Sequence, residues 1–418
     1  MNISPVAPPT THETRLDRFA EIAVRVGLGG FQPGQELLMT APLEALPLAR
    51  RITAHAYRAG AALVTTLLAD DEATLLRYRL APGDSFGKAA GWLYDGMAAA
   101  FRDGAARLAI VGEDPNLLSG EDPSKVARAN HARSIAYRPA LELITGTAIN
   151  WTIVAAATPA WAKAVFPDLS GEQAVAQLWD AIFATSRVDA EDPIAAWAAH
   201  NATLMARRHR LNAKRYAALH FRGPGTDLRV GLADEHEWMG GLSTARNGIT
   251  GNPNIPTEEV FTTPHCRHVE GTVASTKPLS HQGTLIRDIA VRFESGRIVR
   301  ATARSGQDVL QRMLSADDGA RRLGEVALVP ASSPIARSGL LFFNTLFDEN
   351  AACHIALGQS YSRCFTDRGK AGAQALAARG ANRSLIHVDW MIGSPQVDVD
   401  GIAAGGDAEP LLRGGEFV

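Results

Sequence analysis

Carboxylates and a histidine lie close together in residues 324–361, beside strongly apolar segments. This stretch contains Glu325, Asp348, Glu349, His354 and Tyr361. An apolar run follows Glu325, and LLFF precedes Asp348. Charged groups beside core-forming segments are costly to bury unless they are paired or bind a metal. We therefore predict that this stretch contributes to a metal site.

Two further stretches offer the same kinds of side chain. His387 and Asp389 are two residues apart in IHVDWM, and residues two apart on a β-strand point to the same face. Both could therefore reach one ion. Upstream, NIPTEEVFT at 254–262 adds Glu258 and Glu259. Oxygen ligands together with imidazole are the set expected for Zn, Mn, Co or Fe rather than for a thiolate site.

These residues are sufficient for a site with two metal ions. Two divalent ions about 3.5–4 Å apart can share a bridging carboxylate and activate a water between them. The residues that meet this need are Glu259, Glu325, Glu349, His354, His387 and Asp389. Tyr361 follows His354 by seven residues, so on a helix it would lie on the same face and could donate to a developing oxyanion.

Each candidate also has a simpler interpretation. Glu325 after a glycine is typical of a surface or capping residue, and Glu349 could cap a helix starting near Asn350. The HxD pair is the better signal, because both side chains need a partner if buried. Three other histidines have turn-like neighbours and are expected to be exposed or to lie behind the ligands: His265, His268 and His281.

Composition describes an ordinary soluble globular protein. The 418 residues are enough for two domains, and 46% are hydrophobic and 21% charged. The formal net charge of −2 provides no general attraction for nucleic acid or an acidic membrane, and neither partner is expected.

The cysteines and the N-terminus favour a cytoplasmic protein. The three cysteines, Cys266, Cys353 and Cys364, are odd in number and widely spaced, so we expect no disulfide framework and a reducing compartment. Cys353 is interpreted as a small buried residue rather than a reactive thiol. The segment MNISPVAPPTTHET lacks a basic region followed by an apolar core, so neither a signal peptide nor a membrane span is predicted.

Strands alternate with helices in the first half, which predicts a parallel α/β layer. Strands are predicted over 36–40, 62–68 (buried), 108–111 and 150–156, and helices over 14–26, 47–59, 88–102 and 124–137. Gly27-Leu28-Gly29-Gly30 follows a helix and lacks phosphate-loop spacing, so we interpret it as a helix stop.

The pattern changes after two further predicted helices, over 174–186 and 193–218. The second helix contains a basic cluster, Arg207 to Arg210, interpreted as a solvated face. Short β-like segments with glycine and proline turns follow, over 220–232, 285–293 and 297–303. We predict an N-terminal α/β domain with a parallel sheet over 1–190 and a C-terminal α+β catalytic domain with a mixed sheet over 191–418.

Several segments together resemble the thermophilic aminopeptidase T family of metallo-aminopeptidases. They include NIPTEEVFTTPH (254–265), LGEVALVP (323–330), LFDENAACHIALGQSY (346–361) and HVDWMIGS (387–394). The N-terminal segments LDRFAEIAVRVGL and PLEALPLARRITAHAYRAGA match as well, so the resemblance covers nearly the entire chain in order.

The resemblance implies a two-metal exopeptidase that removes N-terminal residues from short peptides. It implies two divalent ions (Zn, Co or Mn) and a homodimer that encloses the active sites. The metal ligands would be Glu259, Glu325 as the bridge, Glu349, His354, His387 and Asp389, with Tyr361 beside the metals. Neighbouring strand residues face opposite ways, so only one of Glu258 and Glu259 can be a ligand.

The catalytic roles follow as a hypothesis. Glu349 or Glu258 would act as the general base, and Tyr361 would stabilise the oxyanion. Two other functions compete with this one. His354, His387 and Asp389 could form the facial triad of a mononuclear iron ring-cleaving dioxygenase on a similar fold, although such a site does not need the three glutamates. A single structural metal is the third interpretation.

Overall fold

The first half of the chain forms a parallel sheet, as its pattern predicts. The computed structural model describes residues 11–281, 283–367 and 370–418. The interpretation of the N-terminus concerns residues 1–14, of which 1–10 lie outside the described residues. The strand order is β2-β1-β3-β4. The bounds are β1 (Glu36–Pro42), β2 (Leu63–Ala69), β3 (Ala106–Val111) and β4 (Trp151–Ala155).

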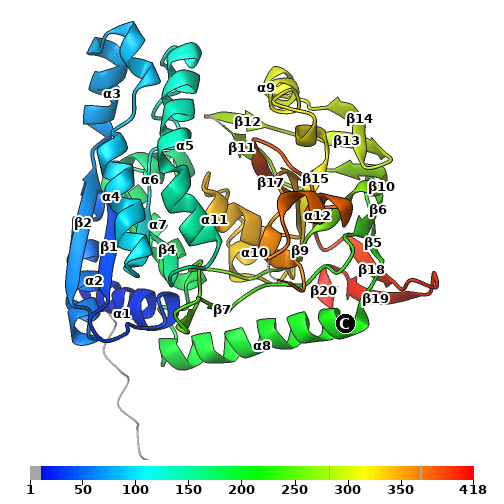
Figure 1. Ribbon diagram of the computed structural model, residues 1–418, viewed down its shortest axis with the longest axis horizontal. Helices are drawn as coiled ribbons and strands as arrows, with labels where there is room; N and C mark the ends of the chain where they lie inside the picture. Colours follow the sequence, from blue (N-terminus) through cyan, green and yellow to red (C-terminus); the bar gives the residue numbers. More distant parts are fainter. Residues whose placement is uncertain (1–10, 282, 368–369) are drawn as a thin grey trace, which may run out of the picture.

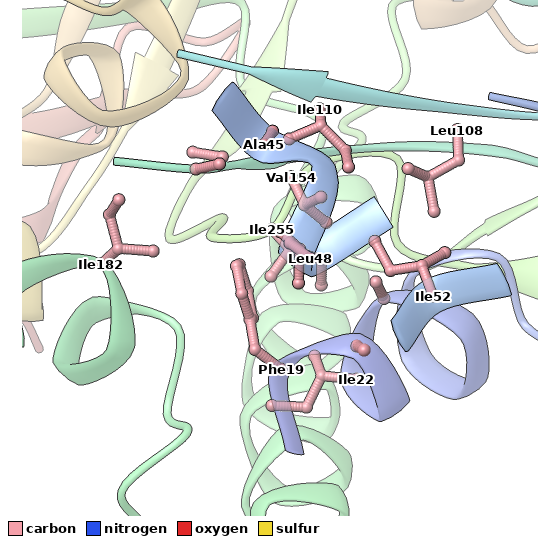
Figure 2. Close-up of a cluster of buried hydrophobic side chains, with 14 of the residues drawn as sticks. Phe19, Ile22, Ala45, Leu48, Ile52, Leu108, Ile110, Val154, Ile182 and Ile255 are labelled. Carbon is pink, nitrogen blue, oxygen red and sulfur yellow. The ribbon is translucent and has the colours of Figure 1, made fainter. Parts of the chain in front are cut away.

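Helices cover both faces of this sheet, which explains its apolar strands. On one face, side chains of β1, β3 and β4 pack with α1 (His12–Ile22), α2 (Leu46–Arg58) and α7 (Gly171–Thr185). Figure 2 shows Phe19, Leu48 and Ile182 in this core. On the other face, Leu38 packs with α4 (Gly91–Arg102) and α5 (Pro123–Thr145).

Two expectations for this half are wrong in detail. The predicted strand at 62–68 exists as β2, but it is the edge of the sheet, and Leu63 and Leu68 are 47% and 45% exposed. A buried strand was inferred because an apolar run alone does not distinguish an edge from a centre. The following helix α3 (Asp71–Leu80) was not predicted, and α5 continues past Pro139 to Thr145.

Helix α8 (Pro193–Lys214) runs from the first half of the molecule to the second (Figure 1). It ends at Arg215, which has φ +51°. The prediction of a solvated basic face is wrong for part of the cluster. Arg207 is half-buried, with its Cζ 4.2 Å from the centre of the Phe417 ring, and Arg208 is also half-buried.

The second half forms two antiparallel sheets. The larger has the order β14-β13-β10-β6-β5-β18-β19-β20. Its strands are β5 (Ala218–Gly223), β6 (Thr226–Leu232), β10 (Pro264–Ala274), β13 (Ala290–Glu294), β14 (Arg297–Thr302), β18 (Asp398–Ile402), β19 (Ala408–Arg413) and β20 (Glu416–Phe417). The smaller, here called the site sheet, has the order β17-β16-β15-β9, with β9 (Val260–Thr262), β15 (Leu323–Leu328), β16 (His354–Gly358) and β17 (His387–Met391).

Short elements complete the second half. The parallel sheet with its helices and the antiparallel sheets that follow confirm the predicted α/β fold class. A two-residue antiparallel ladder joins β7 (Ser243–Thr244) to β8 (Thr250–Gly251). A three-residue ladder joins β11 (Leu279–His281) to β12 (Thr284–Ile286). The helices are α9 (Gln307–Met313), α10 (Pro334–Ser338), α11 (Thr345–Asp348) and α12 (Ala373–Ala378). Among the described helices, including α6 (Pro159–Val165), none has the length and apolar character needed to cross a bilayer.

The two halves share one hydrophobic core. Phe342, Leu346 and Phe347 come from the second half but pack in the core of the parallel sheet. The Trp161 indole donates to the Phe342 carbonyl, and its ring lies 5.7 Å from that of Phe347. The segment that carries Glu349 is therefore attached to the first half, while the domain boundary near residue 190 stays a prediction.

Candidate metal centre

Strand pairing brings most of the predicted ligands onto one face of the site sheet. Glu325 on β15 and Asp389 on β17 both pair with Ala356 on β16. Directly paired residues share a face, as do residues two apart along a strand. His354 therefore joins this face from β16 and His387 from β17. The methyl group of Ala356 leaves room among the larger side chains.

A β-bulge at Gly324 sets the position of Glu325. The register shifts between Leu323 and Glu325, and this extra residue brings Glu325 opposite Ala356. A side chain at Gly324 would place its Cβ 2.4 Å from the carbonyl oxygens of Gly358 and Gln359. The glycine before Glu325 thus permits a close backbone approach, and Glu325 is not the surface residue that its glycine neighbour suggested.

The two adjacent glutamates point to different environments. Phe261 pairs with Ala327, and Glu259, two residues before Phe261, lies on the ligand face. Its Oε2 is 3.1 Å from His354 Nε2. Glu258 instead has Oε1 2.7 Å from Arg187 NH2, and its backbone N–H donates to Asn350. The structure therefore brings Glu259, and not Glu258, to the other candidate ligands.

Glu325 is common to two groups of potential ligand atoms. Within the described residues, Glu259, Glu325 and His354 form one group, and Glu325, His387 and Asp389 form the other, each with its ligand atoms within 4.8 Å of one another. His354 Nε2 lies 3.8 Å from Glu325 Oε1, and His387 Nε2 lies 3.5 Å from Glu325 Oε2. His387 Nε2 is also 3.6 Å from Asp389 Oδ2.

The histidines are oriented for metal binding. His354 Nδ1 donates to the Ala352 carbonyl at 3.1 Å, and His387 Nδ1 donates to the Gln359 carbonyl at 2.7 Å. In both histidines Nε2 faces the carboxylates, which is the orientation found in metal-binding histidines. Three buried atoms in the site have no well-oriented hydrogen-bond partner within the described chain: Glu259 Oε2, His354 Nε2 and Asp389 Oδ1. The donor set therefore fits divalent cations.

The charges of the site are unbalanced without cations. Burial raises the pKa of Glu259 and of Asp389. Burial also raises the pKa of Glu349, and the nearby Glu259 and Asp389 raise it further. Burial would raise the pKa of Glu325 as well, but His354 and His387 lower it to about 2. Four carboxyl groups, two on buried and two on half-buried residues, against two imidazoles create the negative potential that attracts metal ions.

Glu349 and Tyr361 lie beside these two groups. Glu349 belongs to neither group within the described residues, but it lines the same cavity. It begins a short 3₁₀ turn, Glu349–Ala351, rather than capping a longer helix. The Tyr361 ring centre is 4.7 Å from that of His387. Tyr361 was predicted to share a helix face with His354. This prediction is wrong, because His354 begins the strand β16 and Tyr361 follows that strand.

A cavity of about 530 Å³ opens over the site. The site sheet provides one wall, and the parallel sheet provides another through Val111, Trp151 and Ile153. Its acidic lining consists of Glu113, Asp114, Glu259, Glu325, Glu349 and Asp389. The size suits a small molecule or a few residues of peptide.

The remaining sequence candidates lie elsewhere. His265 is buried and stacks on His268 with ring centres 3.7 Å apart, and neither belongs to a described ligand group. His265 is therefore not exposed, which was one of the two positions predicted for it. Asp348 accepts from the backbone N–H groups of Phe342 and Asn344. Cys353 is buried as predicted, and burial raises the pKa of its thiol to about 11.

Comparison with known proteins identifies the family. The family model described as thermophilic metalloprotease (M29) matches residues 12–417. The chain belongs to this family. This chain is 54% identical over 403 residues to aminopeptidase T from Thermus thermophilus, a match that covers 96% of this chain and 98% of the relative. It is 44% identical over 405 residues to aminopeptidase 2 from Geobacillus stearothermophilus, with 97% and 98% covered.

A solved structure agrees with these relatives. This chain matches wild-type AmpT from Thermus thermophilus with a TM-score of 0.92 and 52% identity. The match covers 98% of this chain and 100% of AmpT. A 2,5-dihydroxypyridine dioxygenase from Pseudomonas putida KT2440 matches with a TM-score of 0.49 and 13% identity, which says nothing about function. The predicted resemblance is confirmed, and so is the prediction of a metallo-aminopeptidase.

Two cavity-lining features of the M29 metalloprotease were missed from the sequence. Glu113 and Asp114 are not among the predicted site residues, although they follow the carboxyl end of β3, where parallel sheets commonly bind ligands. Arg363 lines the cavity two residues after Tyr361. A lone arginine after a serine gave no sequence signal.

Proposed function

We propose that this M29 metalloprotease is a two-metal aminopeptidase that removes the N-terminal residue from short peptides. Glu259 and His354 would hold one ion, His387 and Asp389 the other, and Glu325 both. The observation that carries this proposal is that Glu325 is common to both groups of ligand atoms. Zn, Co and Mn all suit such carboxylate and imidazole ligands. A mononuclear iron site would leave Glu259 and Glu325 without a role.

Bound divalent ions would acidify a water to a nucleophile at neutral pH and polarise the peptide carbonyl. The residues of the chain would do the rest. The acidic end of the cavity would bind the free α-amine of the peptide. Glu349 would take a proton from the water at its carboxylate and deliver it to the leaving amine. Its position in the cavity supports this role over Glu258, whose carboxylate contacts Arg187.

Tyr361 would stabilise the oxyanion by donating its hydroxyl proton in a hydrogen bond. Burial raises the pKa of this phenol well above its ordinary value, and Glu325 and Asp389 raise it further. The hydroxyl therefore keeps its proton at neutral pH. The walls contributed by the parallel sheet would exclude water from the reacting carbonyl and limit the length of the peptide.

The proposal extends to the assembly and the compartment. A homodimer enclosing the cavity follows from the family resemblance, and light scattering of the purified protein tests it. A cytoplasmic location is supported by the three free cysteines, Cys266, Cys353 and Cys364.

Hydrolysis of leucine p-nitroanilide tests the activity. We expect the purified protein to hydrolyse it, to lose activity on chelation, and to regain it when Zn, Co or Mn is restored. Metal analysis should give two ions per chain in the reactivated protein. Activity that persists after complete metal removal, or no activity with any of the three ions, contradicts the proposal.

A further inference from the structure

One basic side chain in the cavity has no role in the reaction described so far. Arg363 lies in the cavity wall between two aromatic rings. Its Cζ is 5.3 Å from the centre of the Phe261 ring and 5.2 Å from that of Tyr361. Cation–π contacts at this range hold the guanidinium in place without using its N–H donors. The donors are thus available for another group.

No acidic partner within the described chain neutralises Arg363. Some other half-buried arginines have carboxylate partners, such as Arg187 with Glu258 and Arg379 with Asp367. For Arg363, the described residues provide no ion pair within 4.0 Å, and its buried Nε has no hydrogen-bond partner. Leaving a buried donor unsatisfied costs free energy. A free anion in the cavity would remove this cost.

Arg363 and the acidic side chains line one cavity, so the cavity presents groups of opposite charge. The carboxylates of the candidate metal centre attract an amine, whereas Arg363 attracts an anion. The Tyr361 ring contacts both regions: its centre is 4.7 Å from that of His387 and 5.2 Å from Arg363 Cζ. A short peptide with both termini free carries one group for each.

We propose that Arg363 binds the C-terminal carboxylate of dipeptides and tripeptides. This inference rests on the proposed aminopeptidase function and names its substrate class: short peptides with both termini free. A guanidinium suits this task, because it can make two parallel hydrogen bonds to a carboxylate. The amine and the carboxylate together would set the register of the scissile bond over the metal centre.

Paired substrates with and without the carboxylate test this role. We would measure kcat and KM for leucyl-leucine and leucyl-leucinamide with the wild type, R363M and R363K. Met keeps the apolar stem against Phe261 and Tyr361, and Lys keeps only the charge. R379M is the matched control, since it removes an arginine that does not line the cavity.

Loss of hydrogen bonds to a charged group corresponds to a factor of about 10 to 100. We expect R363M to lower kcat/KM for leucyl-leucine by this factor, mainly through KM, and to change leucyl-leucinamide by less than about threefold. R363K should keep part of the wild-type preference for leucyl-leucine over leucyl-leucinamide, and R379M should keep all of it.

Three outcomes overturn the inference. Equal losses on the acid and the amide would mean that Arg363 acts on Tyr361 or on folding, and a matching drop in melting temperature would identify the latter. Unchanged kinetics on both would mean that the carboxylate binds elsewhere. If the metal-loaded wild type hydrolyses neither peptide, the proposed function itself fails, and the carboxylate subsite with it.

Discussion

We propose different roles for Glu325 and Glu349, although both carboxylates line one cavity. Glu325 lies close to both histidines, at 3.8 and 3.5 Å, whereas Glu349 belongs to neither ligand group in the described residues. We predict that E325Q binds at least one ion fewer per chain and is inactive. We predict that E349Q keeps its metal and loses about 10²- to 10⁴-fold in kcat, as expected for a lost general base.

Metal analysis and steady-state kinetics on the same samples check both variants, and E44Q, at an exposed glutamate outside the cavity, serves as the control. Full metal content and activity in E325Q would rule out the bridging role. Loss of metal in E349Q would instead make Glu349 a ligand, which is the role that the family resemblance implies.

At the scale of residues, the sequence predicts the ligands better than it predicts their arrangement. The HxD spacing at His387 and Asp389 predicts one shared face, because strand alternation is a local rule. The choice between Glu258 and Glu259 depends on the pairing of Phe261 with Ala327, which is 66 residues away in the chain. Tyr361 and Arg363 reach the site through a loop whose path no local pattern encodes.

At the scale of elements, a buried ion pair holds the segment that carries Glu259. Burial raises the pKa of Glu258, while Arg187 lowers it, and the Arg187 guanidinium also lies 5.0 Å from the Trp197 ring. We predict that R187M destabilises the protein by about 3–5 kcal/mol, because an uncompensated carboxylate stays buried. The double variant R187M/E258Q should recover most of this loss.

Melting temperatures of the two single variants and the double variant measure the coupling in a double-mutant cycle. Additive effects would mean that the pair does not stabilise the fold. The metal affinity of R187M should fall along with its stability if the pair positions Glu259, and a normal affinity would limit the pair to a structural role.

His200 makes the same region sensitive to pH. Its Nε2 donates to the Thr257 carbonyl at 2.7 Å, and its Nδ1 accepts from Arg187 at 3.0 Å. Burial lowers the pKa of His200 to about 4, and the Arg187 charge contributes. Since the pKa is lower in the folded state, the unfolded chain binds a proton that the folded chain does not. The stabilisation is complete above about pH 6.5 and is lost towards pH 4.

H200Q provides the comparison, because a glutamine can make both hydrogen bonds without titrating. We predict that the melting temperature of the wild type falls relative to that of H200Q between pH 7.5 and pH 5. The full effect is on the order of 3 kcal/mol when the pH reaches the folded-state pKa. A constant difference between the two proteins over this range would mean that folding does not change the pKa of His200.

The order of elements is predictable where a pattern is local. The parallel strands β1, β3 and β4 were predicted, because apolar runs between helices indicate strands buried on both faces. Strand β2 was predicted to be buried but is exposed, and helix α3 was not predicted. The leucines of both elements pack less fully than their sequence suggests. For example, Leu80 of α3 is 77% exposed.

At the scale of the whole molecule, the sequence predicts two parts but not how they share a core. Composition and strand spacing change near residue 190, and this change is local. The packing of Phe342 and Phe347 against Trp161 joins segments about 180 residues apart, for which a single sequence has no signal. The cavity between the halves is therefore also beyond sequence reasoning, because it needs both walls.

This shared core couples stability to the metal centre. Phe347 is fully buried against Phe342 and Trp161, two residues before Glu349. We predict that F347A loses about 3–5 kcal/mol of stability through the cavity it creates. We also predict a weaker apparent affinity for metal and a lower kcat, because the turn that carries Glu349 loses its attachment to the first half.

F86A is the matched control, since Phe86 is equally buried but lies in a separate small core with Tyr78 and Ala129. It should lower the melting temperature by a similar amount and leave metal affinity and kcat unchanged. Titration of metal into the chelated variants, followed by calorimetry and activity, distinguishes the two. Equal effects of both variants on metal binding would mean that the site depends only on global stability. An effect confined to F347A would mean that the first half of the molecule helps to build a metal centre whose candidate ligands all come from the second.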